Sequence, residues 1–166
     1  MSTPPTPSQT VGPFFGVGLP YDDAENAVPP GTPESIRIEG QVLDGQGDPV
    51  PDALLEVWDG KAAFGRCRTD AEGAFHFVAV KPAVEEAGNR PSEAPHLNVT
   101  VFARGLLRHL ITRLYFPDEA TANAEDPVLS LVAPERRSTL IAKGDGSVLH
   151  FDIRLQGDNE TVFFVI

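Results

Sequence analysis

The alternation of apolar and polar residues over positions 97–104 constrains the fold more than any other feature of this sequence. Four apolar residues at odd positions face one way and four residues at even positions face the other, which is the period of a β-strand. Gly105 then interrupts the pattern, and alternation resumes over 109–116. Two such runs around a glycine-containing connection predict a β-hairpin.

Short runs of the same kind recur along the chain, over 36–43, 53–58, 65–69, 74–80, 149–155 and 161–166. The segment 44–48 has turn composition, and the turn over 70–73 predicts a second hairpin between its flanking strands. Residues 120–124 suggest one helical turn, and 139–142 a short strand. The 16 prolines and 15 glycines favour many turns over long helices. The sequence therefore predicts one all-β domain, an antiparallel β-sandwich over 36–166.

Residues 1–35 contain many prolines, which restrict the backbone and remove hydrogen-bond donors. Apolar side chains at 11, 14, 15, 17 and 19 argue against a disordered tail. We therefore expect an ordered N-terminal arm that packs on its own domain or on a partner's domain.

Charge and targeting signals narrow the classes of function. The formal net charge is −11, which argues against binding to nucleic acids or to anionic membranes. Cys67 is the single cysteine, so an intrachain disulfide is impossible. The N-terminus lacks the basic and apolar regions of a signal peptide, and no run reaches the length of a membrane span. We expect a cytoplasmic protein.

The four histidines give little sign of a metal site. His76, His109 and His150 stand alone within predicted strands and have no ligand spacing, so a structural role is expected. His96 lies where a loop enters a strand, and Asn98 follows on the same face. A histidine at the second position would have given a pair of imidazoles suited to a metal.

Nucleophile and phosphate-binding motifs do not appear in the sequence. Cys67 lies within a predicted strand between two arginines and has no histidine nearby in the sequence. Arg104, at the end of its strand, could bind a carboxylate with two hydrogen bonds, although an ordinary surface ion pair is the simpler interpretation.

Four blocks carry a resemblance to a known family: residues 7–14, 95–105, 112–116 and 151–164. They resemble the intradiol ring-cleaving dioxygenases, and most of all the alpha chains of that family. Its iron-binding beta chains read His-Ile-His where this chain reads His96-Leu97-Asn98, and they hold Fe(III) with two tyrosinates and two histidines. Only His96 has a counterpart here. The resemblance therefore implies a vestigial metal site at His96 and Asn98, no metal held by this chain, and Fe(3+) carried by a partner beta chain.

The resemblance also implies an activity and a set of binding residues. The expected reaction is the O2-dependent opening of 3,4-dihydroxybenzoate to 3-carboxy-cis,cis-muconate by a hetero-oligomer of αβ units, in the breakdown of aromatic compounds. Catalytic residues are expected in the partner and none in this chain alone. The implied substrate-binding residues are Thr10, Gly12, Pro13, Phe14 and Arg104.

Phe14 departs from the family pattern, because alpha chains often have tyrosine there. Two alternatives stay open at this point. One is a non-catalytic binding or structural module with a transthyretin-like fold, since the segments 50–53 and 56–58 occur in many such sandwiches. The other is a single-chain catechol dioxygenase, which the missing ligands disfavour.

Overall fold

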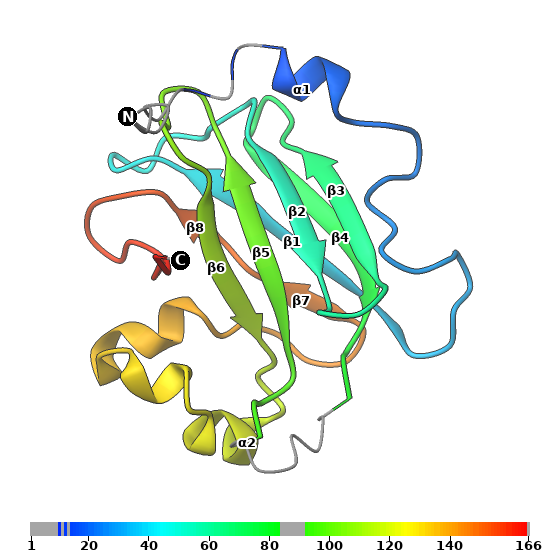
Figure 1. Ribbon diagram of the computed structural model, residues 1–166, viewed down its shortest axis with the longest axis vertical. Helices are drawn as coiled ribbons and strands as arrows, with labels where there is room; N and C mark the ends of the chain where they lie inside the picture. Colours follow the sequence, from blue (N-terminus) through cyan, green and yellow to red (C-terminus); the bar gives the residue numbers. More distant parts are fainter. Residues whose placement is uncertain (1–9, 11, 13, 84–91, 166) are drawn as a thin grey trace, which may run out of the picture.

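The computed structural model describes residues 10, 12, 14–83 and 92–165, which form two sheets packed face to face (Figure 1). The front sheet has the strand order β3-β2-β5-β6, with bounds Phe64–Arg68, Leu54–Trp58, His96–Phe102 and Leu110–Tyr115. The rear sheet has the order β4-β1-β7, with bounds Ala74–Val80, Ser35–Leu43 and Val148–His150. The strand β8, Ile153–Arg154, also pairs with β1. The predicted β-sandwich is confirmed.

The front sheet is antiparallel throughout, whereas the rear sheet is mixed, because β7 and β8 run parallel to β1. Between β7 and β8 the chain leaves the ladder, and the Asp152 carboxylate accepts the hydrogen bond of Gln41 N at 3.0 Å in place of a backbone carbonyl. The run predicted over 149–155 is thus two short strands.

The core lies between the sheets and follows the predicted alternation. In β4 and β5 every second residue is buried, so that the inner faces of the two strands meet. Phe75 and Phe77 of the rear sheet pack with their ring centroids 6.0 Å apart, in the same core cluster as Val99 and Val101 of the front sheet. Burial of this apolar surface is the main force that holds the two layers together.

The hairpin predicted at 97–116 is confirmed, with β5 and β6 paired from His96↔Tyr115 to Val101↔Leu110. The second predicted hairpin is wrong. The Asp70 carboxylate does hold a tight turn, accepting hydrogen bonds from Glu72 N and Ala74 N. However, β3 pairs with β2 in the front sheet and β4 with β1 in the rear sheet, so this turn crosses between layers.

Two further predicted strands are reduced to single bridges. Residues 139–142 give one parallel bridge, Tyr115↔Ile141, after a 3-10 helix over Pro134–Thr139. The segment 161–165 gives one bridge, Ile111↔Phe164. The helical turn expected near residue 120 is present as α2, Ala120–Glu125, and a second 3-10 helix spans Leu129–Leu131.

The described part of the N-terminal arm contains a short helix, α1, over Phe15–Gly18, and then follows the sandwich. Phe15 and Ala24 are buried, and Ala24 O accepts a hydrogen bond from Arg66 N of β3 at 2.6 Å. Asn26 bridges Val78 of β4, so this segment touches both sheets of its own domain. No helix among the described residues is long and apolar enough to cross a membrane.

Candidate functional site

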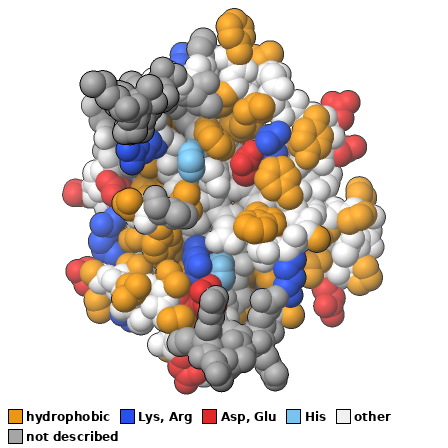
Figure 2. All heavy atoms as spheres, in the orientation of Figure 1, with side chains coloured by type: hydrophobic (Ala, Val, Ile, Leu, Met, Phe, Trp, Pro, Cys, Tyr) orange, Lys and Arg blue, Asp and Glu red, His pale blue; other side chains and the backbone are white. Residues whose placement is uncertain are grey.

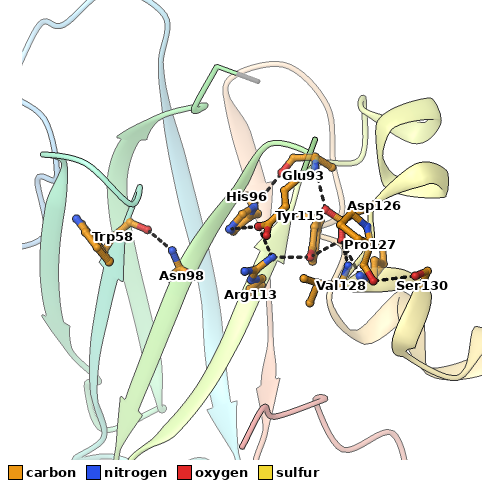
Figure 3. Close-up of polar contacts among 12 residues, drawn as sticks. Trp58, Glu93, His96, Asn98, Arg113, Tyr115, Asp126, Pro127, Val128 and Ser130 are labelled. Atoms are coloured by element: carbon orange, nitrogen blue, oxygen red, sulfur yellow. Dashed lines mark hydrogen bonds and ion pairs between the residues drawn. The ribbon is translucent and has the colours of Figure 1, made fainter. Parts of the chain in front are cut away.

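The two residues predicted as a vestigial metal site lie on the outer face of the front sheet, near the start of β5 (Figure 3). His96 Nδ1 lies 2.8 Å from Ala94 O, and its ring lies against Tyr115 with centroids 5.6 Å apart. Burial lowers the pKa of His96, so the neutral imidazole is favoured. Asn98 donates to Trp58 O at 3.4 Å.

Arg113 of β6 brings a permanent positive charge to this place. It is the cross-strand partner of Asn98, and its side chain is only 19% exposed. Its guanidinium donates to Glu93 Oε2 at 2.8 Å and to the Tyr115 hydroxyl at 3.3 Å. Glu93 Oε2 also lies 3.7 Å from His96 Nε2. A single carboxylate therefore faces both the arginine and the histidine (Figure 3).

Asp126 anchors the inner side of the same network. Its carboxylate is fully buried and accepts hydrogen bonds from Ala94 N, Leu129 N and the Tyr115 hydroxyl, at 2.8, 2.6 and 3.1 Å. Burial is the main cause that raises the pKa of Tyr115, so this phenol stays protonated near neutral pH. Buried carboxylates of this kind are tolerated because hydrogen bonds replace the lost water.

These groups do not suit ferric iron. A ferric site needs anionic oxygen donors around open space. Here the Glu93 carboxylate is paired with the Arg113 guanidinium, the Asn98 amide is neutral, and the Tyr115 phenol donates to Asp126. Among the described residues, no cluster of three or more histidine, cysteine, aspartate or glutamate side chains is arranged to hold a metal. The arrangement is a closed, charge-compensated network.

Arg104 lies at the opposite end of β5 from His96, and the strand between them is roughly 20 Å long. Arg104 Nε forms an ion pair with the Asp52 carboxylate, while the arginine side chain stays 69% exposed. Asp52 precedes β2 and Arg104 follows β5, so both residues belong to the same end of the front sheet.

The arm residues gather at this same end (Figure 1). Gly16 of α1 lies beside Asp52, since an added Cβ would be at van der Waals distance, 3.8 Å, from Asp52 O. Thr10 is exposed, Phe14 is 78% exposed, and Gly12 has φ of 88°, a conformation that suits glycine. Pro13 lies outside the described residues. The structure thus brings Arg104 to the same end as the arm, and separates both from His96 and Asn98.

The remaining histidines and the cysteine lie elsewhere. His76 and His150 flank Glu39 on the outer face of the rear sheet, and the ring of His109 lies 5.6 Å from that of Phe102. Cys67 is half-buried, and burial raises the pKa of its thiol, which disfavours the reactive thiolate.

Sequence reasoning missed Asp52 and the Glu93–Arg113–Tyr115–Asp126 network. The pairing of Asp52 with Arg104 depends on the register between β2 and β5, which lie far apart in the sequence, so no local signal indicated Asp52. No local signal marks Asp126, whose partners come from three separate segments.

Comparison with known proteins gives a consistent result, although no protein-family model matches the chain. The alpha chain of protocatechuate 3,4-dioxygenase from Burkholderia cepacia is 45% identical over 193 aligned residues, covering 96% of each chain. The alpha chain from Pseudomonas putida is 44% identical, covering 97% of this chain and 96% of its own. The alignments are longer than the 166 residues of this chain, so these relatives carry insertions that it lacks.

More distant relatives share the fold. The Burkholderia cepacia beta chain of the same enzyme is 32% identical, covering 86% of this chain and 74% of its own. The dioxygenase domain of a carbohydrate-binding fusion protein from Streptomyces sp. SirexAA-E superposes with a TM-score of 0.60 at 25% identity, covering 93% of this chain and 99% of that one. Catechol 1,2-dioxygenase from Pseudomonas arvilla C-1 has a TM-score of 0.57 at 22% identity, and the superposition covers 80% of this chain and 55% of that one.

The sequence resemblance and the architecture agree over nearly the whole chain. The chain belongs to the intradiol ring-cleaving dioxygenases, among the alpha chains of protocatechuate 3,4-dioxygenase.

Proposed function

We propose that this chain is the alpha subunit of an enzyme that opens 3,4-dihydroxybenzoate between its two hydroxylated carbons, with O2, to give 3-carboxy-cis,cis-muconate. The observation that carries the proposal is the 45% identity to an alpha chain over 96% of both proteins. Two structural features support a division of labour between subunits: the closed network at His96, and the exposed Arg104 at the far end of β5.

The partner in this proposal is a beta chain, which holds the ferric iron with two tyrosinates and two histidines. Exposed apolar side chains support such a partner. Phe14 and Val17 in the arm are 78% and 71% exposed. Figure 2 shows further hydrophobic side chains gathered on the front sheet. Trp58 of β2 and Phe64 of β3 are 47% and 38% exposed, and Tyr21, in the arm between α1 and β1, is 57% exposed. Exposed apolar surface of this kind is typical of an interface with another chain.

In this arrangement the arm, residues 1–35, and the end of the sandwich that carries Arg104 complete the wall of the substrate pocket. Thr10, Gly12, Pro13 and Phe14 line it from the arm. Arg104 binds the substrate carboxylate, because a guanidinium matches a carboxylate with two parallel, charge-assisted hydrogen bonds. The sandwich domain, 36–166, supports both parts.

Steady-state kinetics of the co-expressed αβ complex tests the proposal. The wild-type complex should open 3,4-dihydroxybenzoate. Arg104→Ala should lower kcat/KM for this substrate roughly 10- to 150-fold, which is the loss expected when a charge-assisted hydrogen bond is removed. Catechol lacks the carboxylate, so its turnover should fall much less. The iron content should be unchanged, since the beta chain holds the metal.

Several results would contradict the proposal. A wild-type complex that assembles with iron but opens no ring would remove the proposed function. An unchanged kcat/KM in Arg104→Ala would return this residue to an ordinary surface ion pair. A chain that does not associate with the beta chain would instead favour a transthyretin-like binding module.

A further inference from the structure

We propose that Asp52 is a positioning residue that holds Arg104 ready for the substrate carboxylate. The inference rests on the proposed function, because it assigns a role to the residue beside the proposed carboxylate-binding arginine. The observation that carries it is the ion pair between Arg104 Nε and Asp52 Oδ2 at the end of the sandwich where the arm lies.

Strand register places the two side chains together. The ladder between β2 and β5 ends with Leu54 opposite Phe102. Asp52 and Arg104 each lie two residues beyond that last pair, so they are opposite one another on the same outer face. The intervening Ala53 and Ala103 are buried, at 0% and 1% exposure, and fix both backbones to the core.

The segment that carries Asp52 is itself held firmly. The buried Thr69 hydroxyl accepts a hydrogen bond from Ala53 N at 2.9 Å and donates one to Val50 O at 2.7 Å. Thr69 N donates to Ala53 O at 2.9 Å. The Asp52 side chain is only 20% exposed, so its carboxylate is a fixed anchor for a much more exposed arginine.

The ion pair with Asp52 leaves Arg104 able to bind a second anion. Asp52 faces Nε, the nitrogen nearest the aliphatic stem. The Arg104 side chain is 69% exposed, so its two terminal nitrogens are accessible to a substrate carboxylate. A long side chain held at Nε has fewer conformations to lose when the substrate binds, so affinity improves by preorganisation.

The segment that carries Asp52 also lies beside the arm. A Cβ added at Gly16 would reach van der Waals distance of this segment, at 3.8 Å from Asp52 O and 3.4 Å from Arg68 Nε. The two parts of the proposed pocket wall, Arg104 and the arm, therefore both lie next to Asp52.

Kinetics of the purified αβ complex with Asp52→Asn tests the inference, because asparagine keeps the shape and removes the charge. We expect KM for 3,4-dihydroxybenzoate to rise about 3- to 10-fold, the cost of ordering one long side chain, with a smaller change in kcat. KM for catechol should stay unchanged. In the Arg104→Ala background, Asp52→Asn should have no further effect, since its action runs through Arg104.

Asp118→Asn is the matched control, because Asp118 pairs with Lys81 at the opposite end of the sandwich. This variant should have the wild-type KM for both 3,4-dihydroxybenzoate and catechol. Arg104→Lys provides a second test if the complex with Asp52→Asn does not assemble. It keeps the charge but lacks the fork, so KM for the carboxylated substrate alone should rise.

The inference is overturned by an unchanged or lower KM in Asp52→Asn, by an equal effect on catechol, or by an effect that persists without Arg104. An unchanged KM in Arg104→Lys would overturn it as well. A wild-type complex that does not open 3,4-dihydroxybenzoate at all would instead reject the proposed function on which the inference depends.

Discussion

His96 should make the stability of the fold depend on pH. Burial lowers its pKa in the folded chain, whereas the unfolded chain has the ordinary value of about 6.5. Above that value both states are neutral and the residue contributes nothing. As the pH falls below about 6.5, the unfolded state takes up a proton that the folded state resists, so the folded state loses stability.

Replacement of His96 by asparagine should remove this part of the pH dependence. Chemical denaturation at pH 7.5 and 5.5 should show a smaller loss of unfolding free energy for His96→Asn than for the wild type. His109→Asn is the control, because His109 is exposed on the turn before β6. An identical loss in the wild type and in His96→Asn would show that burial does not affect this imidazole.

Sequence predicts the positions of such residues better than their surroundings. Alternation correctly placed His96 and Asn98 on one face of β5, because the period of a strand is local. It could not show that Arg113 lies opposite Asn98, since that depends on the register between two strands. Nor could it show the contact of Asp126 with Ala94, which lies 32 residues earlier in the chain.

At the scale of one element, β1 depends on the absence of a side chain at Gly40. A Cβ at this position would lie 2.0 Å from Phe151 O, a backbone atom that cannot move aside easily. Gly40→Ala should therefore separate β1 from the β7–β8 connection and destabilise the fold by about 3 kcal/mol or more, the upper range for overpacking.

Equilibrium denaturation measures the effect of Gly40→Ala directly. Gly18→Ala in α1 is the control, because an added Cβ there meets no atom within 4 Å. The control should unfold at nearly the wild-type denaturant concentration. Equal midpoints for the two variants would mean that the sheet tolerates a side chain at Gly40 by a rearrangement of the β7–β8 connection.

Turn chemistry explains why strands were predicted well and some pairings were not. The Asp70 carboxylate and Gly73, with φ of 70°, form a tight turn of the kind seen in hairpins. Whether the next strand returns to the same sheet or crosses to the other is decided by long-range packing, and here β4 pairs with β1. The apolar C-terminal run is a related case, since its described part, residues 161–165, meets β6 at one bridge, Ile111↔Phe164.

At the scale of the whole molecule, the two ends of the front sheet have different characters. The end at His96 is closed by Arg113, Glu93 and Asp126, whereas the end at Arg104 presents an exposed guanidinium and an apolar arm. A pocket completed by another chain therefore fits the Arg104 end.

The isolated chain should accordingly bind no stoichiometric iron and should lack the visible absorption that iron gains from tyrosinate ligands. The Arg113 guanidinium lies 2.8 Å from Glu93 Oε2, and Arg113 is the cross-strand partner of Asn98, so its positive charge disfavours a cation near His96 and Asn98. Tyr115 cannot supply a tyrosinate near neutral pH, because burial raises the pKa of its phenol and its hydroxyl already contacts Asp126.

Metal analysis and absorption spectra of the chain purified alone, beside the co-purified αβ complex, give the decisive comparison. The complex should contain iron and show the visible absorption of tyrosinate-bound iron, and the isolated chain should show neither. Asn98→His alone should not restore metal binding, because the Arg113 charge remains. The double variant Asn98→His with Arg113→Gln supplies the second imidazole and removes that charge. It should therefore bind divalent metal more tightly than either single variant. One tightly held iron per isolated wild-type chain would contradict the vestigial site and move the catalytic metal into this subunit.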